Sequence, residues 1–430
     1  MTADLTDTKT FFIFTTGCKA NQWDSHVITD KLERSGFIRV TAEAADLVVI
    51  NACSLTGRAE TDARRFIGRT RRVNPAALVA LVGCHAQAYP MRDFGADLVL
   101  GQGEKFEIDR YLPEKGRFVA SSRVFPMEKT GIADQKGRTR FFFKIQDGCN
   151  KFCSYCIVPI ARGAGRSRPV EDVAATMEAL RKKGIKEVVL TGIDIAAYRD
   201  PASGMGLKDL LLLFESLPTP PRIRLSSVDP DYMDDAFIEV LAASGKIAKS
   251  IHIPVQSGSD RILKGMGRGY GSASIVALVK RLKGRIPAIG IGMDIIAGFP
   301  GEDEEAFEET CAFIEALGIS YLHVFPYSER PGTRASGFGG KVAESVKRRR
   351  VKSLKKIDAA KREAFSRGHL GQRVCIIPEA KMYAGRFMRG FSDNYLPVYI
   401  PYEKTLENNL VDVTITDMQD SRLIGGLRCS

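Results

Sequence analysis

The sequence predicts an α/β protein with an N-terminal open parallel sheet domain, a central partial β/α barrel and a small C-terminal all-β barrel. Three observations lead to this fold class. Apolar, strand-like runs alternate with helical segments at the start of the chain, the alternation restarts near residue 140, and the residues after Gly368 are rich in β-forming runs. Alternating strands and helices indicate a parallel sheet with helices on both faces. We therefore expect domains at 1–120, 135–335 and 368–430, and a basic linker helix at 341–367.

The N-terminal domain contains four apolar runs that predict strands. Helical patterns follow two of them, at about 24–35 and 58–73, and Gly36 stands where the first helix is expected to stop. The second of these helices is rich in arginine. The four predicted strands are 11–14 (FFIF), 47–50 (LVVI), 78–82 (LVALV) and 97–100 (DLVL).

A polar stretch at 121–138 predicts a linker, after which the strand–helix pattern begins again. Six further strands in about 190 residues suit a partial β/α barrel, whose chemistry lies at the carboxyl ends of its strands. The six are 141–145 (FFFKI), 187–190 (EVVL), 222–226 (RIRLS), 250–255 (SIHIPV), 289–298 (IGIGMDIIAG) and 321–325 (YLHVF).

The rest of the chain contains a basic helical segment followed by a β-rich segment. Residues 341–367 are basic and contain neither Pro nor Gly, which predicts one long helix. The runs VCII, YLPVYI and LVDVTIT, separated by turns that contain Gly and Asn, then predict a small all-β module of the barrel type.

The composition narrows the function classes. The chain has no run of about 18 apolar residues, and its N-terminus, MTADLTDTKT, lacks a signal-peptide pattern, so we expect a cytoplasmic protein without a membrane partner. The net charge of +12 points to a polyanionic partner, most commonly nucleic acid. The chain has nine cysteines, and clustered thiols in a reducing compartment bind metals or act in catalysis more often than they form disulfides.

Cys149, Cys153 and Cys156 form a C-x3-C-x2-C loop directly after a predicted strand. Thiolates suit zinc or iron–sulfur centres. A structural zinc site needs four ligands, whereas the loop has three thiols and no histidine nearby. An iron–sulfur cubane held by three cysteines keeps one iron free for a substrate, so the missing ligand is a functional feature in that interpretation. A zinc-binding or plain cysteine-rich turn is the alternative.

The spacing of these cysteines, with Tyr155 before the last of them, resembles that of the radical S-adenosylmethionine (SAM) enzymes. In that superfamily the open iron binds the amino and carboxylate groups of SAM. Polar residues and glycine turns at later strand ends fit SAM binding, because glycine lets the backbone approach a ligand closely. The candidate SAM-binding residues are Tyr155, Gly192, Ser227 and Gln256.

Cys18, Cys53 and Cys84 are far apart in the sequence, but each follows an apolar strand within about four residues. The carboxyl ends of neighbouring parallel strands open onto one crevice, so the three thiols can converge if the strand order allows it. The alternative is that each is a buried cysteine acting as a small hydrophobe. His85 is either a further ligand or an ordinary satisfied histidine. Cys311, Cys375 and Cys429 are predicted to be structural.

Several segments together resemble the radical SAM methylthiotransferases. TTGCKANQWDS, NACSLTGRAE and VGCHAQ are similar to the N-terminal domain of that family, KIQDGCNKFCSYCIVPIARGAGRSRP to its radical SAM loop, and HVFPYSERPGTRA to the end of its core. The final module, with GFSDNYLPVYI, resembles the TRAM domain, a β-rich RNA-binding appendage. LTGIDIAAY and GCKANQ resemble the branch that acts on N6-threonylcarbamoyladenosine in tRNA, although His26 and Ala52 depart from the usual glutamate and threonine.

The resemblance implies an enzyme that converts this nucleoside, at position 37 beside the anticodon, to its 2-methylthio form. It implies two 4Fe–4S clusters and SAM as cofactors. The partners would be the anticodon stem-loop of tRNA, a low-potential electron donor and a sulfur source. Cys149, Cys153 and Cys156 would hold the radical-generating cluster, and Cys18, Cys53 and Cys84 an auxiliary cluster that presents sulfur.

Basic residues are candidates for phosphate contacts, although any single one can be an ordinary solvated charge. Two alternatives are open for the aromatic residues Phe387, Phe391 and Tyr395: they stack on bases or they fill the small core. The candidate phosphate-binding residues are Arg64, Arg65, Arg69, Arg71 and Arg72 on the arginine-rich helix and 347–350 on the linker helix.

Three alternatives to this function are open. The same chemistry could act on isopentenyladenosine in tRNA, or on a side chain of a ribosomal protein. A chain of this kind could also be a non-catalytic iron–sulfur sensor that binds RNA. A sensor predicts no SAM cleavage, whereas the enzyme releases 5′-deoxyadenosine when it is given SAM and a reductant.

Overall fold

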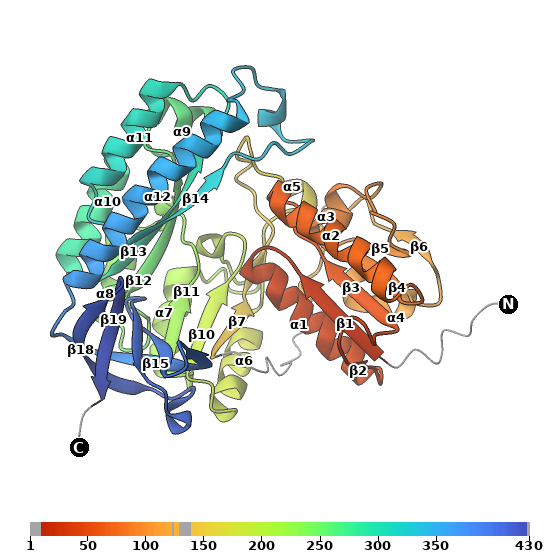
Figure 1. Ribbon diagram of the computed structural model, residues 1–430, viewed down its shortest axis with the longest axis horizontal. Helices are drawn as coiled ribbons and strands as arrows, with labels where there is room; N and C mark the ends of the chain where they lie inside the picture. The colour runs from red at the N-terminus through yellow and green to blue at the C-terminus, as the bar shows by residue number, and fades with distance from the viewer. Residues whose placement is uncertain (1–9, 123, 129–138, 428–430) are drawn as a thin grey trace. The chain divides into compact units, whose positions relative to one another are not determined.

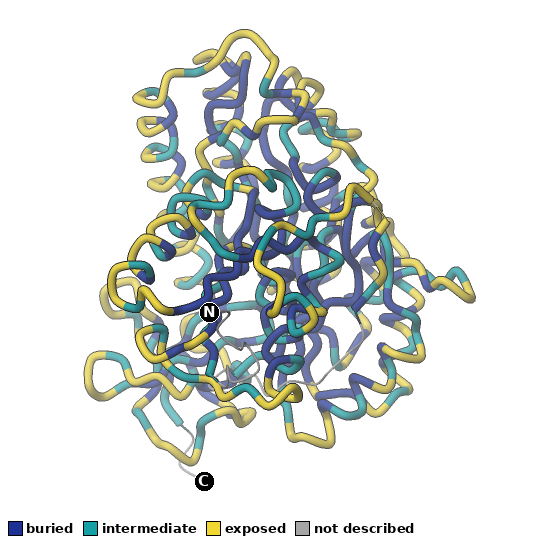
Figure 2. Tube along the Cα trace, turned by 90° about the vertical axis from the view of Figure 1, so that its right-hand side faces the viewer, coloured by how far each residue is buried: buried dark blue, intermediate teal, exposed yellow. Residues whose placement is uncertain are grey.

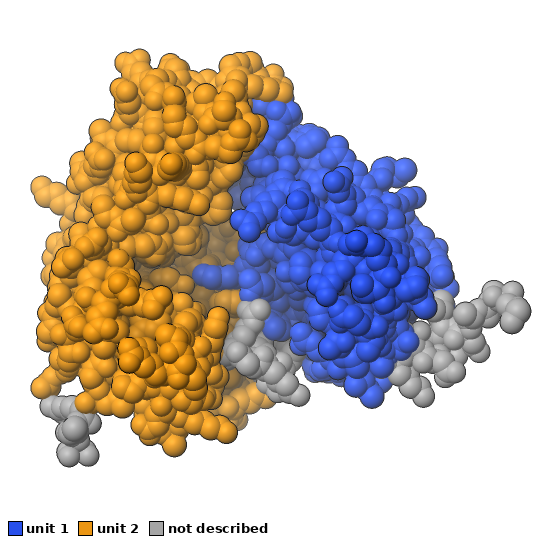
Figure 3. Space-filling model, in the orientation of Figure 1, with its two compact units in different colours: residues 1–135, 144–168, 328–336 blue, residues 136–143, 169–327, 337–430 orange. Residues whose placement is uncertain are grey.

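The computed structural model describes residues 10–122, 124–128 and 139–427. The chain forms two compact units, which are coloured separately in Figure 3. Unit 1 contains residues 1–135, 144–168 and 328–336, and unit 2 contains residues 136–143, 169–327 and 337–430. Strands are mostly buried and exposed residues gather on turns and outer helix surfaces (Figure 2). In the described residues, no helix is both long and apolar enough to cross a membrane.

Unit 1 is built on a six-stranded parallel sheet (Figure 1). The four strands predicted from apolar runs are confirmed, whereas β2 and β6 were missed because they are short, with two and three residues, and lie at the two edges. In sheet order the strands are β2 (Ile38–Arg39), β1 (Thr10–Thr15), β3 (Leu47–Asn51), β4 (Leu78–Val82), β5 (Leu98–Leu100) and β6 (Gly116–Phe118).

Helices cover both faces of this sheet, as predicted. One face packs against α1 (Lys19–Arg34) and α4 (Ile108–Tyr111), and the other against α2 (Gly57–Val73) and α3 (Cys84–Ala88). Helix α1 begins five residues before the predicted start, directly after Cys18. The early start brings Asn21, Trp23 and Asp24 into the buried part of unit 1.

Unit 1 also contains the C-x3-C-x2-C loop. Strand β8 (Gln146–Asp147) pairs antiparallel with β9 (Arg166–Ser167), so residues 148–165 form a closed loop that includes α5 (Val158–Ala161). The predicted linker at 121–138 is only partly described. Phe125 and Glu128 of this predicted linker are buried, at 4 and 6% exposure. Residues 123 and 129–138 lie outside the described residues.

Unit 2 contains the predicted partial β/α barrel. Two three-stranded sheets are joined by bridges from Ile223 to Ile247 and from Ser227 to His252. The six helices that follow the strands are α6 (Val170–Lys182), α7 (Leu207–Ser216), α8 (Asp235–Ala243), α9 (Asp260–Met266), α10 (Ser272–Arg285) and α11 (Glu304–Ala316). The six predicted strands are confirmed, in the order β7 (Arg140–Lys144), β10 (Glu187–Thr191), β11 (Arg222–Leu225), β12 (Ser250–Gln256), β13 (Gly290–Ala297) and β14 (Tyr321–Pro326).

The predicted basic helix is confirmed as α12 (Glu344–Arg367), which lies along α11 and β14 (Figure 1). Two of its charges are not available to an RNA phosphate. Arg350 is 3% exposed and pairs with Glu302 at 2.9 Å, and Lys347 is 8% exposed and pairs with Glu344 at 2.7 Å. The expectation that 347–350 contact phosphate is therefore wrong for these two side chains, because acidic residues of unit 2 neutralise them.

The C-terminal module is a closed five-stranded barrel, as predicted. Its own apolar core includes Ile376, Met388, Val398 and Ile415, all fully buried or nearly so. In barrel order the strands are β15 (Arg373–Tyr383), β16 (Phe387–Ser392), β17 (Pro397–Pro401), β19 (Arg422–Leu427) and β18 (Val411–Gln419).

This small barrel is docked on the strands of the β/α barrel within unit 2. Arg224 donates to the carbonyl oxygens of Ser392 and Asp393 at 2.9 and 2.8 Å. The guanidinium of Arg140 stacks 4.5 Å from the ring centroid of Phe391, and Arg224 lies 5.0 Å from that of Tyr395. Phe391 and Tyr395 therefore neither stack on RNA bases nor fill the core of the small barrel in this structure. Their rings line the contact between the two barrels of unit 2.

Candidate metal centres

The strand order brings Cys18, Cys53 and Cys84 to one edge of the sheet. Strands β1, β3 and β4 are adjacent and parallel, and one of the three cysteines follows each carboxyl end. Backbone hydrogen bonds continue past the strands, from Ala52 N to Val82 O and from His85 N to Ala52 O, both at 3.0 Å. The geometric condition that the sequence left open is therefore met.

Hydrogen-bond donors and a helix N-terminus surround these three thiols. Cys18 is the N-cap of α1, where the positive end of the helix dipole favours a thiolate. The Sγ of Cys53 accepts a hydrogen bond from Leu55 N at 3.4 Å. The Sγ of Cys84 accepts from Arg162 Nε at 3.1 Å and from Gln102 Nε2 at 3.3 Å. Donors of this kind stabilise a negatively charged sulfur.

Burial raises the pKa of the Cys53 thiol, and the nearby thiols of Cys18 and Cys84 raise it further. Burial also raises the pKa of Cys18, against the opposing charge of Arg162. A bound cation would stabilise the charged forms of Cys18 and Cys53, which burial and the neighbouring thiols disfavour. A metal group that binds here must displace protons, so its affinity increases with pH.

The spacing of the sulfurs distinguishes between kinds of metal centre. Two sulfurs on one zinc ion are at most about 4.6 Å apart, because each Zn–S bond is about 2.3 Å. Among the described residues, the groups with ligand atoms within 4.8 Å of one another are His252–Asp294–His323 and Asp24–Glu128–Asp147. Neither cysteine triad is among them, so the three sulfurs of each triad do not all lie within the span of one zinc ion.

The C-x3-C-x2-C loop holds its three thiols half-exposed. Gly148 has a φ of +70°, and a β-carbon there would lie 2.0 Å from the carbonyl oxygen of Ala164, so no other residue fits. The segment 328–336 fixes the loop from outside, since Arg334 donates to Phe152 O at 2.9 Å and Ala335 N to Ser154 O at 2.8 Å.

The candidate SAM-binding residues lie in both units. Tyr155 lies in the loop of unit 1, and Gly192, Ser227 and Gln256 lie at the carboxyl ends of the adjacent strands β10, β11 and β12 of unit 2. Gln256 has a φ of +78°, which is rare for a residue with a side chain and is typical of functional sites. SAM binding by these four residues stays a prediction.

The sequence interpretation missed a buried charged network in unit 1. Arg162 is its centre: Nη1 contacts both oxygens of Asp147 at 2.9 and 3.0 Å, and Nη2 contacts Asp24 at 2.7 Å. Isolated charges inside apolar runs, such as the lysine of FFFKI, were the available signal. The members whose side chains are at most 1% exposed are Asp24, Lys105, Glu128, Lys144, Asp147, Arg162 and Arg168.

A second polar group was also missed, on the barrel strands of unit 2. The Oδ1 of Asp294 lies 2.8 Å from His252 Nε2 and 3.4 Å from His323 Nδ1. Burial opposes ionisation of Asp294, but the two histidines outweigh it and hold its pKa far below the ordinary range. The aspartate in the apolar strand IGIGMDIIAG was the available signal. The alternate strand residues Met293 and Ile295 are fully buried.

The remaining cysteines and His85 take no part in either triad. His85 is buried, its Nε2 lies 3.0 Å from Arg92 O, and its ring stacks on Phe94 at 4.8 Å, which is the environment of a structural histidine. Cys311 lies in α11 and Cys375 in β15. Cys429, also predicted to be structural, lies outside the described residues.

Comparison with known proteins agrees with this geometry. The family model of the radical SAM superfamily matches residues 143–314, and that of the uncharacterized protein family UPF0004 matches residues 10–101. The chain is 36% identical to the threonylcarbamoyladenosine tRNA methylthiotransferase MtaB of Aquifex aeolicus, over 87% of this chain and 94% of the relative. The chain belongs to the radical SAM methylthiotransferase family.

Other members of the family are similarly related. The MtaB of Bacillus subtilis is 35% identical, over 93% of this chain and 92% of the relative. The tRNA-2-methylthio-N(6)-dimethylallyladenosine synthase of Zymomonas mobilis is 33% identical, over 95% of this chain and 94% of the relative. A radical SAM methylthiotransferase is an enzyme that uses a 4Fe–4S cluster and SAM, and the three cysteines of the loop fit that cluster.

Solved structures of other radical SAM enzymes share the fold. The radical SAM methyltransferase TsrM from Kitasatospora setae, solved with cobalamin and a 4Fe–4S cluster, has a TM-score of 0.56 and 18% identity, covering 76% of this chain and 77% of that one. The cobalamin-dependent enzyme OxsB has a TM-score of 0.51 and 11% identity, and the match covers 82% of this chain and 56% of the OxsB chain. At these identities the likeness concerns the fold of the methylthiotransferase alone.

Proposed function

We propose that this methylthiotransferase converts N6-threonylcarbamoyladenosine at position 37 of tRNA to its 2-methylthio form. The observation that carries the proposal is the convergence of Cys18, Cys53 and Cys84 on three adjacent strand ends, in the same compact unit as the C-x3-C-x2-C loop. Two tri-cysteine sites suit a reaction that needs both a radical and a sulfur atom. The names of the Aquifex and Bacillus relatives support the choice of nucleoside.

In this proposal each cysteine triad holds a 4Fe–4S cluster. Cys149, Cys153 and Cys156 hold the first, whose open iron binds SAM, and the other triad holds the second. When bound, SAM and the clusters supply a carbon radical, a sulfur atom and a methyl group, which ordinary acid–base side chains cannot supply to an aromatic C–H. The chain fixes the thiols, shields the site from water and binds the RNA. A low-potential electron donor and a sulfur source complete the reaction.

The polar group His252–Asp294–His323 favours threonylcarbamoyladenosine over isopentenyladenosine. A threonylcarbamoyl group carries a carboxylate, a hydroxyl and a urea, whereas an isopentenyl group is entirely apolar. Both ring nitrogens of His252 are engaged, by Asp294 and by the hydroxyl of Tyr321, whereas the His323 side chain is 51% exposed. In this proposal the imidazole of His323 offers a hydrogen bond that only the first of these substituents can use.

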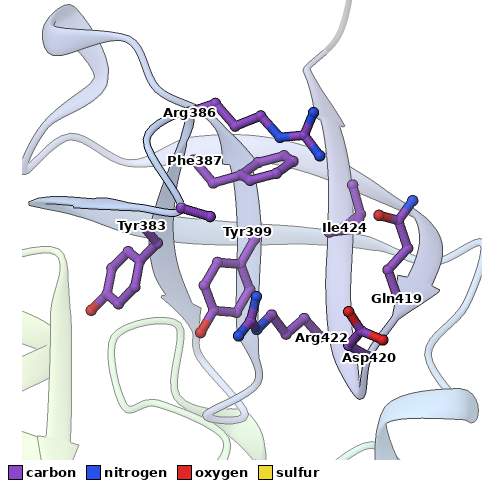
Figure 4. A pocket seen from close by; sticks show the side chains of 9 residues that line it. Tyr383, Arg386, Phe387, Tyr399, Gln419, Asp420, Arg422 and Ile424 are labelled. Carbon is purple, nitrogen blue, oxygen red and sulfur yellow. The ribbon is translucent and has the colours of Figure 1, made fainter.

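The C-terminal barrel supplies a candidate RNA surface. One of its pockets is lined by Tyr383, Phe387 and Tyr399 together with Arg386 and Arg422 (Figure 4). The guanidinium of Arg386 lies 4.9 Å from the ring centroid of Phe387. Aromatic faces next to arginines are typical of surfaces that stack unpaired bases and contact phosphates. The anticodon loop of a tRNA offers both.

The direct test uses the anaerobically reconstituted protein with SAM, dithionite and an anticodon stem-loop. We expect 5′-deoxyadenosine and a methylthio mass gain on a stem-loop that carries threonylcarbamoyladenosine. A methylthio mass gain found only on the isopentenyladenosine stem-loop, or only on ribosomal protein, would show that the proposed substrate is wrong and would identify the other as the substrate. Intact clusters with no 5′-deoxyadenosine would favour a sensor and contradict the proposal.

A further inference from the structure

Arg162 lies between the two cysteine sites of unit 1. Its Nε donates to the Sγ of Cys84 at 3.1 Å, while Nη1 donates to both carboxylate oxygens of Asp147. Asp147 is two residues before Cys149 and pairs, in β8, at the base of the C-x3-C-x2-C loop. One planar side chain therefore contacts a thiol of the proposed second cluster and the base of the loop that holds the first.

The orientation of Arg162 is fixed. Its side chain is 1% exposed, and Nη2 donates to Asn21 Oδ1 at 3.0 Å and to Asp24 Oδ2 at 2.7 Å. All three guanidinium nitrogens are therefore engaged, in the fork geometry that arginine offers and lysine does not. The hydrogen bond to Cys84 cannot move without breaking the others.

Among the residues that the structure describes, the buried network around Arg162 contains more cations than carboxylates. Its described members with side chains at most 1% exposed comprise four cations and three carboxylates. A thiolate at Cys84 would add a negative charge next to Arg162. The cations are Lys105, Lys144, Arg162 and Arg168, and the carboxylates are Asp24, Glu128 and Asp147.

Gln102 provides a second N–H donor to the same sulfur. Its Nε2 donates to Cys84 Sγ at 3.3 Å, and its Oε1 accepts from Lys105 Nζ at 2.5 Å. The amide is thereby oriented with its nitrogen toward the thiol. Cys84 is thus the one thiol of its triad for which two side-chain N–H donors are described.

We propose that Arg162 is a positioning residue that orients Cys84 and raises the reduction potential of the second cluster. This inference rests on the proposed function, because it requires that cluster. Reduction adds negative charge to an iron–sulfur cluster, and N–H···S hydrogen bonds and nearby positive charge stabilise the reduced form. Loss of the Arg162 hydrogen bond therefore makes the potential more negative, and loss of the Gln102 hydrogen bond does so to a smaller extent.

The test uses protein in which Cys149, Cys153 and Cys156 are replaced by Ala, so that only the second cluster contributes. In this background, the potential is measured by redox titration followed by electron paramagnetic resonance, for Arg162→Lys and Gln102→Met. At a fixed ambient potential we expect Arg162→Lys to lower the ratio of reduced to oxidised cluster about tenfold, or about 59 mV for one electron. Gln102→Met should shift the ratio in the same direction by less.

Arg168→Lys is the matched control, because Arg168 belongs to the same buried network and donates to Glu128 at 2.8 Å. We expect its ratio to stay within about twofold of the unsubstituted background. Loss of second-cluster iron in Arg162→Lys alone would also support positioning, and Gln102→Met decides if Arg162→Lys does not fold. Unchanged ratios in Arg162→Lys and Gln102→Met with full iron content, or an equal shift in Arg168→Lys, would overturn the inference while leaving the proposed function intact. A wild-type protein with only one cluster would instead contradict the proposed function.

Discussion

Gly17 and Cys53 are in closer contact than any side chain at position 17 would allow. A β-carbon on Gly17 would lie 2.4 Å from Cβ and 2.7 Å from Sγ of Cys53, and the φ of Gly17 is +98°. Gly17 precedes Cys18, so the turn after β1 brings two thiols of the triad together only because residue 17 has no side chain.

We expect Gly17→Ala to prevent assembly of the second cluster, because the added methyl would push Cys53 away. Iron content after anaerobic reconstitution is the measurement, and it should fall by about half, since each 4Fe–4S cluster contributes four irons. Gly36→Ala is the control: Gly36 has a similar φ of +87°, but no described atom lies within 4 Å of the position that its β-carbon would take. Equal iron contents in the two variants would show that the close approach is not needed.

The pairing of Glu187 with Arg224 predicts that the stability of unit 2 depends on pH. The pair is buried, with Nε and Oε1 2.9 Å apart, and the same guanidinium holds the C-terminal barrel. Burial would raise the pKa of Glu187, but Arg224 outweighs it, so this pKa is below its ordinary value. The stabilisation is therefore complete above the unfolded-state pKa of about 4.3 and is lost as the pH falls through the folded-state pKa.

We expect Glu187→Gln to lower the free energy of unfolding by about 3 kcal/mol at pH 7, because it leaves a buried arginine without its charge partner. In urea titrations this difference from wild type should shrink below about pH 4. Glu239→Gln breaks the exposed pair with Arg285, which solvent screens, and should change the free energy of unfolding far less than Glu187→Gln. If the difference in unfolding free energy between wild type and Glu187→Gln stays constant down to about pH 3, the ionised Glu187 carboxylate is not the source of the stabilisation.

The pocket of the C-terminal barrel predicts a salt-dependent RNA contact (Figure 4). Replacing Arg386 and Arg422 by Gln should weaken binding of an anticodon stem-loop. It should also reduce the slope of log Kd against log salt concentration by about 0.7–0.9 for each phosphate contact removed. Arg285→Gln, on a helix of the β/α barrel, is the control. An unchanged slope for the Arg386/Arg422 variant would remove this pocket from the RNA surface.

Cys311 should behave as a structural thiol. Burial raises its pKa to about 11, and the neighbouring carboxylate of Glu315 contributes. We therefore expect slow alkylation of Cys311 at about pH 8, because little of it is thiolate, and an unchanged iron content in Cys311→Ser. Mass spectrometry of iodoacetamide-treated peptides measures the alkylation, and an iron assay measures the iron content. Loss of iron in Cys311→Ser would mean that a ligand has been misassigned.

The sequence was sufficient wherever a local pattern determines the structure. Apolar runs such as LVVI and LVALV predicted the central strands, because strands buried on both faces are continuously apolar. The adjacency of β1, β3 and β4, on which the convergence of the cysteines depends, was not readable from these runs. It is set by long-range pairing.

Features that depend on partners distant in the sequence were not predictable. The basic run at 347–350 gave no sign that Arg350 pairs with Glu302, 48 residues earlier. Arg162 was one arginine among several in a conspicuous loop, and its contact with Cys84 spans 78 residues. Base stacking and core filling were the two expectations for Phe391 and Tyr395, and neither was right for these two rings, because their partners, Arg140 and Arg224, belong to another barrel of the fold.

The most direct test is an iron count combined with cluster spectroscopy on two proteins: the wild type, and a variant with Cys18, Cys53 and Cys84 replaced by Ala. We expect about eight irons per chain in the wild type and about four in the variant. The variant should still release 5′-deoxyadenosine from SAM but form no methylthio product. About four irons in the wild type, or about eight in the variant, would contradict the presence of a second cluster on these three cysteines.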